Sequence, residues 1–357
     1  MENFDTSAAW MAKDLMIDQS WVFKLTDNEC TQLKEVTKKA FDPKRSLFDY
    51  SKSDFNLNPS FETIQTAANK AYFGPGLALV KGLPRNNMSP EEFELMVWAI
   101  GLHLGVARPQ GKATQYISKV QATENNYRSA NGRGYNSNTE LDFHCDGCDL
   151  VGLACYNKAY HGGKSIISSS VSAWQTLVRE RPDLAEIARE EFHFSRNQEE
   201  ALGEMPYYTQ PLFDFKDGRL FGKWNRNRVM NGQDLINVPK LTSTQNECMD
   251  LLDQILHRPT LMFTMWLNPG DLQFINNHVM LHSRTAFQDH KKLTQKRLLY
   301  RLWIATPKSF RLPSSWAEYF GSIEPGTIRG GIRGQKYDET CKTFEKVQAK
   351  CSGMQEP

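Results

Sequence analysis

The spacing of three residues most limits how this 357-residue chain can fold. His144 and Asp146 stand two apart in Glu140–Leu153 (ELDFHCDGCDLVGL), and His282 is central in Phe274–Phe287 (FINNHVMLHSRTAF). In an extended segment, residues i and i+2 point to the same face, so His144 and Asp146 reach one point while Cys145 faces away. His282 follows His144 by 138 residues. A site shared by all three therefore requires one domain that spans both stretches.

Two imidazoles and one carboxylate form the ligand set of the facial triad, which binds Fe(II) and leaves positions open for other ligands. An H-x-D pair by itself is a common strand pattern, so the assignment of a metal site depends on the downstream stretch with His282. On the residues alone, three other histidines compete with His282 for the third position: His103, His278 and His290.

A strand-like stretch, Gln295–Trp303 (QKRLLYRLW), follows the second motif. Its Arg297 and Arg301 lie 15 and 19 residues after His282. Since the two arginines are four apart, they face the same side of a strand. A buried arginine holds a carboxylate through two parallel hydrogen bonds, and the alternative is a plain ion pair with a carboxylate of the core.

The ordered set HCD, INNHVMLHSRTAF and KRLLYRLWI resembles the TauD/TfdA family of Fe(II)/2-oxoglutarate-dependent dioxygenases, from about Gly74 to Gly334. The resemblance implies a mixed α/β fold with a mainly β core, a double-stranded β-helix (jelly roll) flanked by helices. We expect residues 1–70 to form a helical extension packed on the core, residues 71–335 the dioxygenase domain, and residues 336–357 a C-terminal tail.

The resemblance also implies roles for individual residues. His144, Asp146 and His282 would bind Fe(II), and 2-oxoglutarate and O₂ would take the open positions. Arg297 would hold the distal carboxylate of 2-oxoglutarate, with Arg301 nearer the substrate or on the same carboxylate. Ser165, which follows a Gly-Gly pair as in relatives, would share that carboxylate.

The implied reaction oxidises a small-molecule metabolite and releases succinate and CO₂. Because a carboxylate, Asp146, occupies the position that a halogenase leaves open for chloride, we expect hydroxylation or desaturation. The sequence gives little about the primary substrate. Four residues in stretches expected to border the pocket are candidates for contacting it: Asn138, Trp224, Arg226 and Arg228.

Three alternatives stand beside this interpretation. The same fold could carry another metal chemistry, hydrolysis or isomerisation, although such a site needs no arginine for 2-oxoglutarate. A non-catalytic binding protein could have kept the fold. Cys145 and Cys148 form a C-x-x-C pair, typical of a redox centre or half a zinc site, but no second pair accompanies it.

Composition and charge indicate which kinds of partner the protein binds. The net charge of +2, from 43 basic and 41 acidic residues, gives no electrostatic footprint for nucleic acid. The N-terminus lacks the pattern of a signal peptide, and no stretch has the length of a membrane span. Seven cysteines, an odd number, do not indicate a disulfide framework. We expect a cytoplasmic protein that binds a small molecule and could assemble as a homo-oligomer.

Local patterns predict several elements. Helices are expected over Asp27–Ala40 with Asp27 as cap, after the capping box at Ser89, over 172–192 with a break at Pro182, and from a capping box that opens at Thr244. Strands are expected over 74–82, 115–120, 150–156, 166–169, 261–267 and 272–278. Residues 125–138 are expected to form a loop, which either borders the pocket or is a surface excursion. Residues from 308 onward are expected to be irregular, with the last ten frayed.

Overall fold

The computed structural model describes residues 3–122 and 136–356. A large sheet forms its centre, with strand order β1-β2-β14-β6-β17-β3 and with β4 also paired to β17. β1 and β2 pair in parallel, and the other pairs are antiparallel. The strands of this sheet are β1 (Val22–Lys24), β2 (Leu77–Lys81), β3 (Val106–Arg108), β4 (Ile117–Val120), β6 (Leu150–Asn157), β14 (Leu272–Asn276) and β17 (Leu298–Ala305).

A second, antiparallel sheet has the order β13-β8-β15-β5. Its strands are β5 (Leu141–His144), β8 (Ser165–Ser169), β13 (Phe263–Met265) and β15 (Met280–Arg284). The two sheets share one core, in which Val151 and Ile275 of the large sheet join Ile167 and Leu281 of the small one. Three two-stranded ribbons complete the strands: β9 (Phe192–Ser195) with β10 (Tyr207–Gln210), β11 (Phe213–Lys216) with β12 (Arg219–Gly222), and β7 (His161–Gly162) with β16 (Phe287–Gln288).

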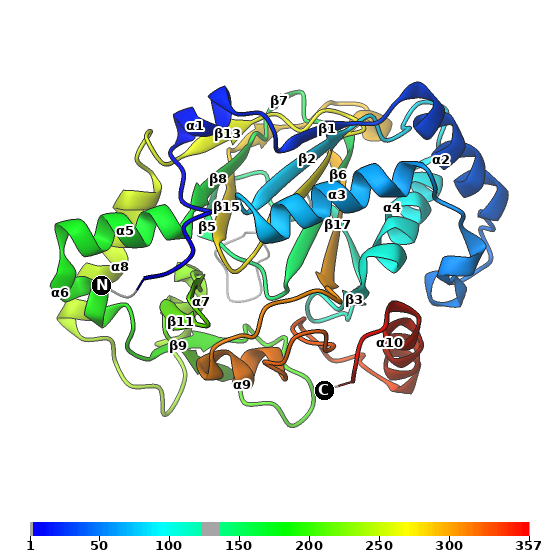
Figure 1. Ribbon diagram of the computed structural model, residues 1–357. Helices are drawn as coiled ribbons and strands as arrows, with labels where there is room; N and C mark the ends of the chain where they lie inside the picture. Colours follow the sequence, from blue (N-terminus) through cyan, green and yellow to red (C-terminus); the bar gives the residue numbers. More distant parts are fainter. Residues whose placement is uncertain (1–2, 123–135, 357) are drawn as a thin grey trace.

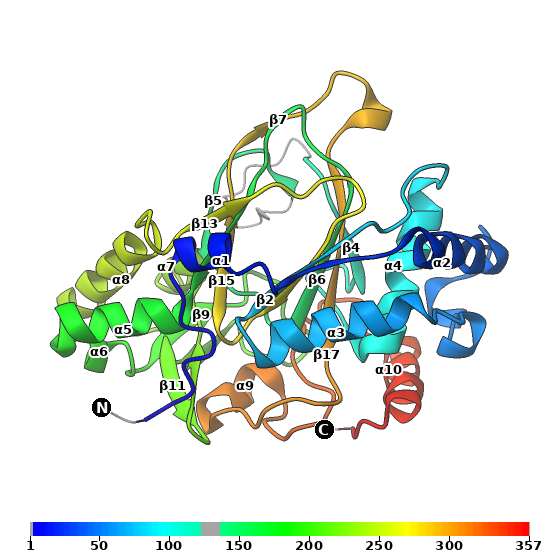
Figure 2. The same ribbon diagram turned by 45° about the horizontal axis from the view of Figure 1, so that its top comes forward.

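Helices cover the sheets on both sides. α2 (Asp27–Ala40), α3 (Ser60–Phe73) and α4 (Pro90–Leu104) lie on one side of the molecule in both views, and α5 (Ser170–Glu180), α6 (Pro182–Ile187) and α8 (Ser243–Leu256) on the other (Figures 1 and 2). The remaining helices are α1 (Ala12–Ile17), α7 (Arg226–Gly232), α9 (Ala317–Phe320) and α10 (Glu339–Ser352). Short 3₁₀ turns occur at Leu47–Asp49, Lys52–Asp54, Leu293–Gln295 and Ser314–Trp316. Within the described residues, no helix combines the length and apolar character needed to cross a membrane.

The alternation of side chains on the central strands explains these layers. On β14, Leu272 and Phe274 pack under the helices, whereas Ile275 faces the small sheet. Both faces of the large sheet are apolar because the helices cover one face and the small sheet covers the other. The mixed α/β class with a large share of sheet agrees with the expectation from sequence.

Several expected elements are confirmed. The capping box at Ser89 opens α4, the break at Pro182 separates α5 from α6, and the strands over 74–82, 150–156 and 272–278 correspond to β2, β6 and β14. Most of the loop expected over 125–138 lies outside the described residues.

Four details differ from expectation. The cap of α2 is Thr26, and that of α8 is Thr242, two residues before the predicted start, because each threonine hydroxyl accepts a hydrogen bond from the third residue after it. The region 1–70 is not purely helical, since β1 extends the large sheet. The last ten residues are not all frayed: α10 continues to Ser352, and Met354 is buried against Val106 and Ala305.

Candidate metal centre and adjoining cleft

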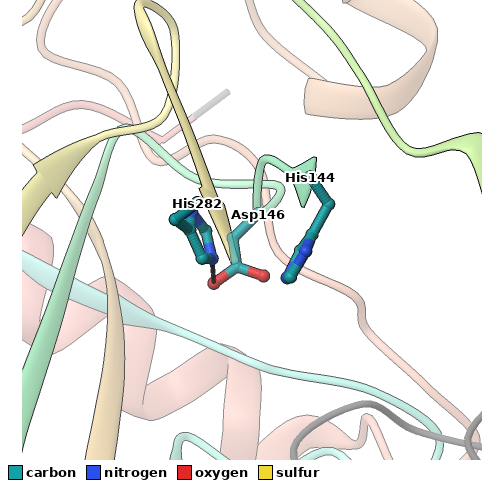
Figure 3. A group of neighbouring side chains, drawn as sticks. All are labelled: His144, Asp146 and His282. Atoms are coloured by element: carbon teal, nitrogen blue, oxygen red, sulfur yellow. Dashed lines mark ion pairs between the residues drawn. The ribbon is translucent and has the colours of Figure 1, made fainter. Parts of the chain in front are cut away.

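The register of two neighbouring strands brings the predicted histidines together. β5 and β15 pair in antiparallel fashion with His144 directly opposite His282, and their ring centroids lie 4.4 Å apart. Asp146 follows two residues after β5 ends and reaches the same point. Figure 3 shows the carboxylate between the two imidazoles, with its Oδ2 atom 3.7 Å from His282 Nε2.

The three side chains offer a compact donor set. One ligand atom from each of His144, Asp146 and His282 can be chosen so that all lie within 4.8 Å of one another, and no other such group of His, Cys, Asp and Glu occurs among the described residues. The Nδ1–H of His144 donates to the carbonyl of Asp142 at 2.9 Å, which leaves Nε2 with its lone pair toward the site. Two imidazole nitrogens and one carboxylate oxygen fit Fe(II).

The charges of the three groups suit a metal. Burial lowers the pKa of His144, and burial together with the neighbouring His144 lowers the pKa of His282 to about 3. Burial would raise the pKa of Asp146, but Arg301 and the two histidines outweigh it and lower that pKa to about 2. Near neutral pH the site therefore holds two neutral imidazoles and one carboxylate, the protonation states that bind metal.

Asp146 is held in place by Arg301 and by residues that the sequence did not single out. The indole Nε1–H of Trp303 donates to Asp146 Oδ2 at 2.9 Å, and the backbone N–H of Asp146 donates to Asn277 Oδ1 at 3.0 Å. Arg301 lies 3.4 Å from both carboxylate oxygens, and its Nε donates to Gln110 Oε1 at 2.8 Å. Trp303 could have been found, because it lies two residues after Arg301 and so faces the same side of β17.

A cleft of about 630 Å³, part of it open to solvent, adjoins His144, Asp146 and His282 between the two sheets. Arg297, Arg301 and Ser165 line it, as do Gln273 and Arg284, which the sequence analysis missed. The rest of its lining is mostly apolar: Val120, Leu141, Val151, Leu153, Leu267, Ile275 and Ser283. The cleft thus has His144, Asp146 and His282 in one part of its lining and several buried arginines in the rest.

Arg297 is the most unusual cation of the cleft. Its side chain is 4% exposed, its Nη1 is buried without a hydrogen-bond partner, and no ion pair reaches it from the described residues. Burial lowers the pKa of its guanidinium to about 10. A buried charge without a counter-ion is costly, so a bound anion would stabilise this position. Arg301, by contrast, already contacts Asp146.

The four residues predicted to contact the substrate lie elsewhere, and none is among the described residues that line the cleft. Arg226 pairs with Asp250 and Asp253, and Arg228 pairs with Glu199. Trp224 is buried, and its backbone carbonyl accepts the N–H of Cys145 at 3.0 Å. The carbonyl of Asn138 accepts the N–H of Phe287 at 2.9 Å.

The other candidate ligands have different partners. The Cys145 thiol faces the carbonyl of Trp224, and Cys148 Sγ accepts a hydrogen bond from Asn277 Nδ2 at 3.2 Å; both cysteines are free. His278 is buried and hydrogen-bonded to Asp149 at 2.9 Å. His290 contacts the ring of Tyr160 instead.

Comparison with known proteins adds to this geometry. The profile described as "Taurine catabolism dioxygenase TauD, TfdA family" matches residues 39–303, well over half of the chain. "FR-33289 synthase" from Streptomyces rubellomurinus is 25% identical over 312 residues, which cover 86% of this chain and 92% of that protein.

Solved structures share the fold. Asparagine oxygenase in complex with Fe(II), 2S,3S-3-hydroxyasparagine and succinate has a TM-score of 0.61 at 18% identity, covering 80% of this chain and 94% of that one. The non-heme iron oxygenase OrfP in complex with Fe and alpha-ketoglutaric acid has a TM-score of 0.57 at 16% identity, covering 80% and 93%.

Proposed function

Since the chain belongs to the TauD/TfdA family of Fe(II)/2-oxoglutarate-dependent dioxygenases, we propose that His144, Asp146 and His282 are its iron ligands. The convergence of one donor atom from each within 4.8 Å carries this assignment. Support comes from the protonation states of the three groups and from the hydrogen bond that directs His144 Nε2 into the site. The enzyme is an oxidoreductase, and its co-substrates are 2-oxoglutarate and O₂.

We further propose that the cleft holds 2-oxoglutarate, with Arg297 on its distal carboxylate. The guanidinium is buried, lacks an ion-pair partner among the described residues, and can form two parallel hydrogen bonds to a carboxylate. Ser165, which the resemblance also places at this carboxylate, lines the same cleft. Arg301 contacts Asp146, one of the proposed iron ligands, and is the candidate for contacting the primary substrate.

Bound Fe(II), with 2-oxoglutarate and O₂, supplies the oxidising chemistry, in which succinate and CO₂ are released. The protein's residues fix the geometry. Trp303 and Asn277 keep Asp146 in one orientation, and the apolar side chains of the cleft limit access of water to the reacting groups. The carboxylate at position 146 completes the triad, which favours hydroxylation or desaturation over halogenation.

The finer architectural assignments belong to the same proposal. We take the two mainly antiparallel sheets as a double-stranded β-helix and residues 71–335 as the dioxygenase domain. Residues 1–70 are then a helical extension packed on the core, residues 336–357 a C-terminal tail, and the cytoplasm the location. For the substrate we propose a small metabolite. The OrfP and asparagine oxygenase structures hold hydroxylated amino acids or succinate, so free amino acids come first in a substrate panel.

The test is succinate formation by the purified protein with Fe(II), 2-oxoglutarate and O₂, measured with and without each compound of the panel. We expect a stimulated rate with the true substrate and no turnover when either Fe(II) or 2-oxoglutarate is left out. A substrate that is converted without 2-oxoglutarate would indicate a hydrolase or isomerase. Iron and 2-oxoglutarate binding without turnover of any panel member would favour a binding protein.

A further inference from the structure

Gln273 places a polar amide in the interior of the protein, where an apolar side chain is usual. It lies on β14, whose residues Leu272 and Phe274 pack under the helices while Gln273 and Ile275 face the cleft. Gln273 is 1% exposed. Burying an amide costs free energy unless its hydrogen bonds are satisfied, so an apolar side chain would be the ordinary choice here.

Among the described residues, only one end of this amide finds a partner. Ser165, the first residue of β8 in the opposite sheet, donates its hydroxyl to Gln273 Oε1 at 3.1 Å. The amide nitrogen Nε2 is buried and has no hydrogen-bond partner within that part of the chain. Buried donors without partners are rare in native proteins, and this one therefore indicates a position that a ligand acceptor would satisfy.

A second donor without a partner lies in the same cleft. Arg297 Nη1 is also buried and lacks an acceptor among the described residues. Arg297 passes close to the turn before Ser165, the partner of Gln273, since a Cβ on Gly163 would come within 3.2 Å of Arg297 Nε. Two such donors suit an acceptor-only group, which is the character of an ionised carboxylate.

We propose that Gln273 is a binding residue for 2-oxoglutarate, donating its Nε2–H to the distal carboxylate that Arg297 pairs with. Ser165 then acts through Gln273. Its single hydroxyl proton is engaged with Gln273 Oε1, so it orients the amide and does not donate to the carboxylate. This inference rests on the proposed binding of 2-oxoglutarate in the cleft and adds to that site one residue and one positioning role.

The test compares Gln273→Met with a matched control, Gln210→Met. Gln210 is also 1% exposed and has both amide atoms without partners among the described residues, but it lies on β10 and is not among those that line the cleft. The affinity for 2-oxoglutarate is measured by calorimetry on the Fe(II) protein without O₂, and folding by thermal unfolding. We expect about tenfold weaker binding for Gln273→Met, the size of one hydrogen bond to a charged group, and unchanged binding for Gln210→Met.

Three further variants make the result decisive. Gln273→Glu keeps the shape of the side chain but places a negative charge beside the carboxylate, so its loss of 2-oxoglutarate affinity should exceed that of Gln273→Met. Ser165→Ala should weaken binding less than Gln273→Met, and the double variant should bind as the Gln273→Met single variant does. Additive losses would mean that Ser165 contacts the carboxylate itself, which would overturn the orienting role.

Wild-type affinity in Gln273→Met would overturn the role of Gln273 while leaving the proposed function intact. Failure of the wild-type protein to bind 2-oxoglutarate would instead overturn the proposed function, and this inference with it. The Fe(II) affinity should be the same in all variants, because neither Gln273 nor Ser165 belongs to the triad.

Discussion

His144 and His282 are direct cross-strand partners on β5 and β15, and their ring centroids lie 4.4 Å apart. The strand register therefore places the side chains of two of the three proposed iron ligands next to each other. Asp146 lies outside the strand and depends on hydrogen bonds from Trp303 and to Asn277. The proposed site thus relies on strand pairing on its histidine side and on side-chain hydrogen bonds on its carboxylate side.

Replacing any one ligand should remove iron. We expect His144→Ala, Asp146→Ala and His282→Ala each to abolish turnover, with a loss of Fe(II) affinity beyond the roughly 10–100-fold that losing an outer hydrogen-bonding partner costs. Iron content after anaerobic loading measures this. His290→Ala is the matched control, since His290 contacts Tyr160 and should keep both iron and activity. Full iron content in His282→Ala would show that another residue is the third ligand.

Removing Arg297 should act on the binding of 2-oxoglutarate alone. A charge-assisted hydrogen bond contributes about 1.5–3 kcal/mol, so Arg297→Ala should raise the apparent Michaelis constant for this co-substrate by at least about tenfold, at ~1.4 kcal/mol per factor of ten. Arg297→Lys should recover only part of the loss, because an ammonium cannot form the two parallel bonds. A 2-oxoglutarate titration of succinate formation measures both variants, with Fe(II) binding as the unchanged quantity.

Arg301→Ala provides the contrast in the same titration. This arginine contacts Asp146 and Gln110, so its removal should change iron retention, or the Michaelis constant for the primary substrate, more than the Michaelis constant for the co-substrate. The two assignments must be exchanged if Arg301→Ala shows the large loss of co-substrate affinity and Arg297→Ala shows almost none.

The C-x-x-C pair should have no role in metal binding. Cys145 Sγ faces the Trp224 carbonyl, and Cys148 Sγ accepts from Asn277, so the double variant Cys145→Ser, Cys148→Ser should keep its iron and most of its activity. Metal analysis of both proteins is the measurement. Stoichiometric zinc that is present in the wild type and lost in the variant would establish the opposite.

His144 and Asp146 could be paired from sequence because strand alternation is a local property, whereas the resemblance to the TauD/TfdA family selected His282 among the histidines. His144 and Asp146 share a face by strand geometry, and Arg297 follows His282 at a fixed distance. The hydrogen bonds that hold Asp146 in place could not be predicted in the same way. Asn277 reaches Asp146 only because the loop after β14 packs beside the H-x-D segment, a contact between residues 131 apart in the sequence.

The glycine-rich stretch 326–334 illustrates the same limit. Its sequence, GTIRGGIRG, predicts an irregular segment but not its place in the fold. In the structure Gly331 donates its N–H to the carbonyl of Gly147, beside Asp146, at 2.7 Å. Gly330 has a φ of +69°, and a Cβ there would lie 2.5 Å from the same carbonyl, so the position requires glycine. Such packing depends on tertiary contacts that a local pattern does not contain.

Arg329, which belongs to the same stretch, pairs with the buried carboxylate of Asp149, and this pair should make the stability of the protein depend on pH. Asp149 is buried between His278 and Arg329, whose Nε donates to it at 2.9 Å. Burial would raise the pKa of Asp149, but Arg329 and His278 lower it to about 2. Because this folded-state pKa lies below the unfolded value near 4, the stabilisation is fully present above about pH 4 and is lost as the pH falls toward about 2.

Asp149→Asn should therefore lower the free energy of unfolding at pH 7 by about 2–3 kcal/mol, at ~1.4 kcal/mol per pKa unit. The difference from the wild type should shrink between about pH 4 and pH 2, where the wild-type carboxyl gains its proton. Denaturant unfolding across pH 2–7 measures it. A difference that stays constant over this range would mean that the loss arises from packing and not from the charge.

The last prediction concerns α10, which attaches the C-terminal segment to the core through a buried ion pair. Arg108 Nη1 lies 2.7 Å from Glu345 Oε1, and Tyr116 and Tyr337 donate their hydroxyls to the same carboxylate at 2.6 and 2.8 Å. Arg108 also donates its Nε–H to the carbonyl of Gly330 at 3.0 Å. The pair thus connects β3, α10 and the glycine-rich stretch that contacts Gly147.

Glu345→Gln keeps the shape of the side chain but leaves the Arg108 charge buried without a partner, which costs about 3–5 kcal/mol in comparable pairs. The control lies on the same helix: Glu339 pairs with Lys342 at 2.6 Å, but their side chains are 85% and 54% exposed. Glu339→Gln should change the free energy of unfolding by less than about 1 kcal/mol, because exposed ion pairs contribute little. Chemical unfolding of the three proteins measures the difference. Equal stabilities for Glu345→Gln and Glu339→Gln would show that α10 is held by its apolar contacts, with Phe344 and Cys341 in the core, and not by the buried charge.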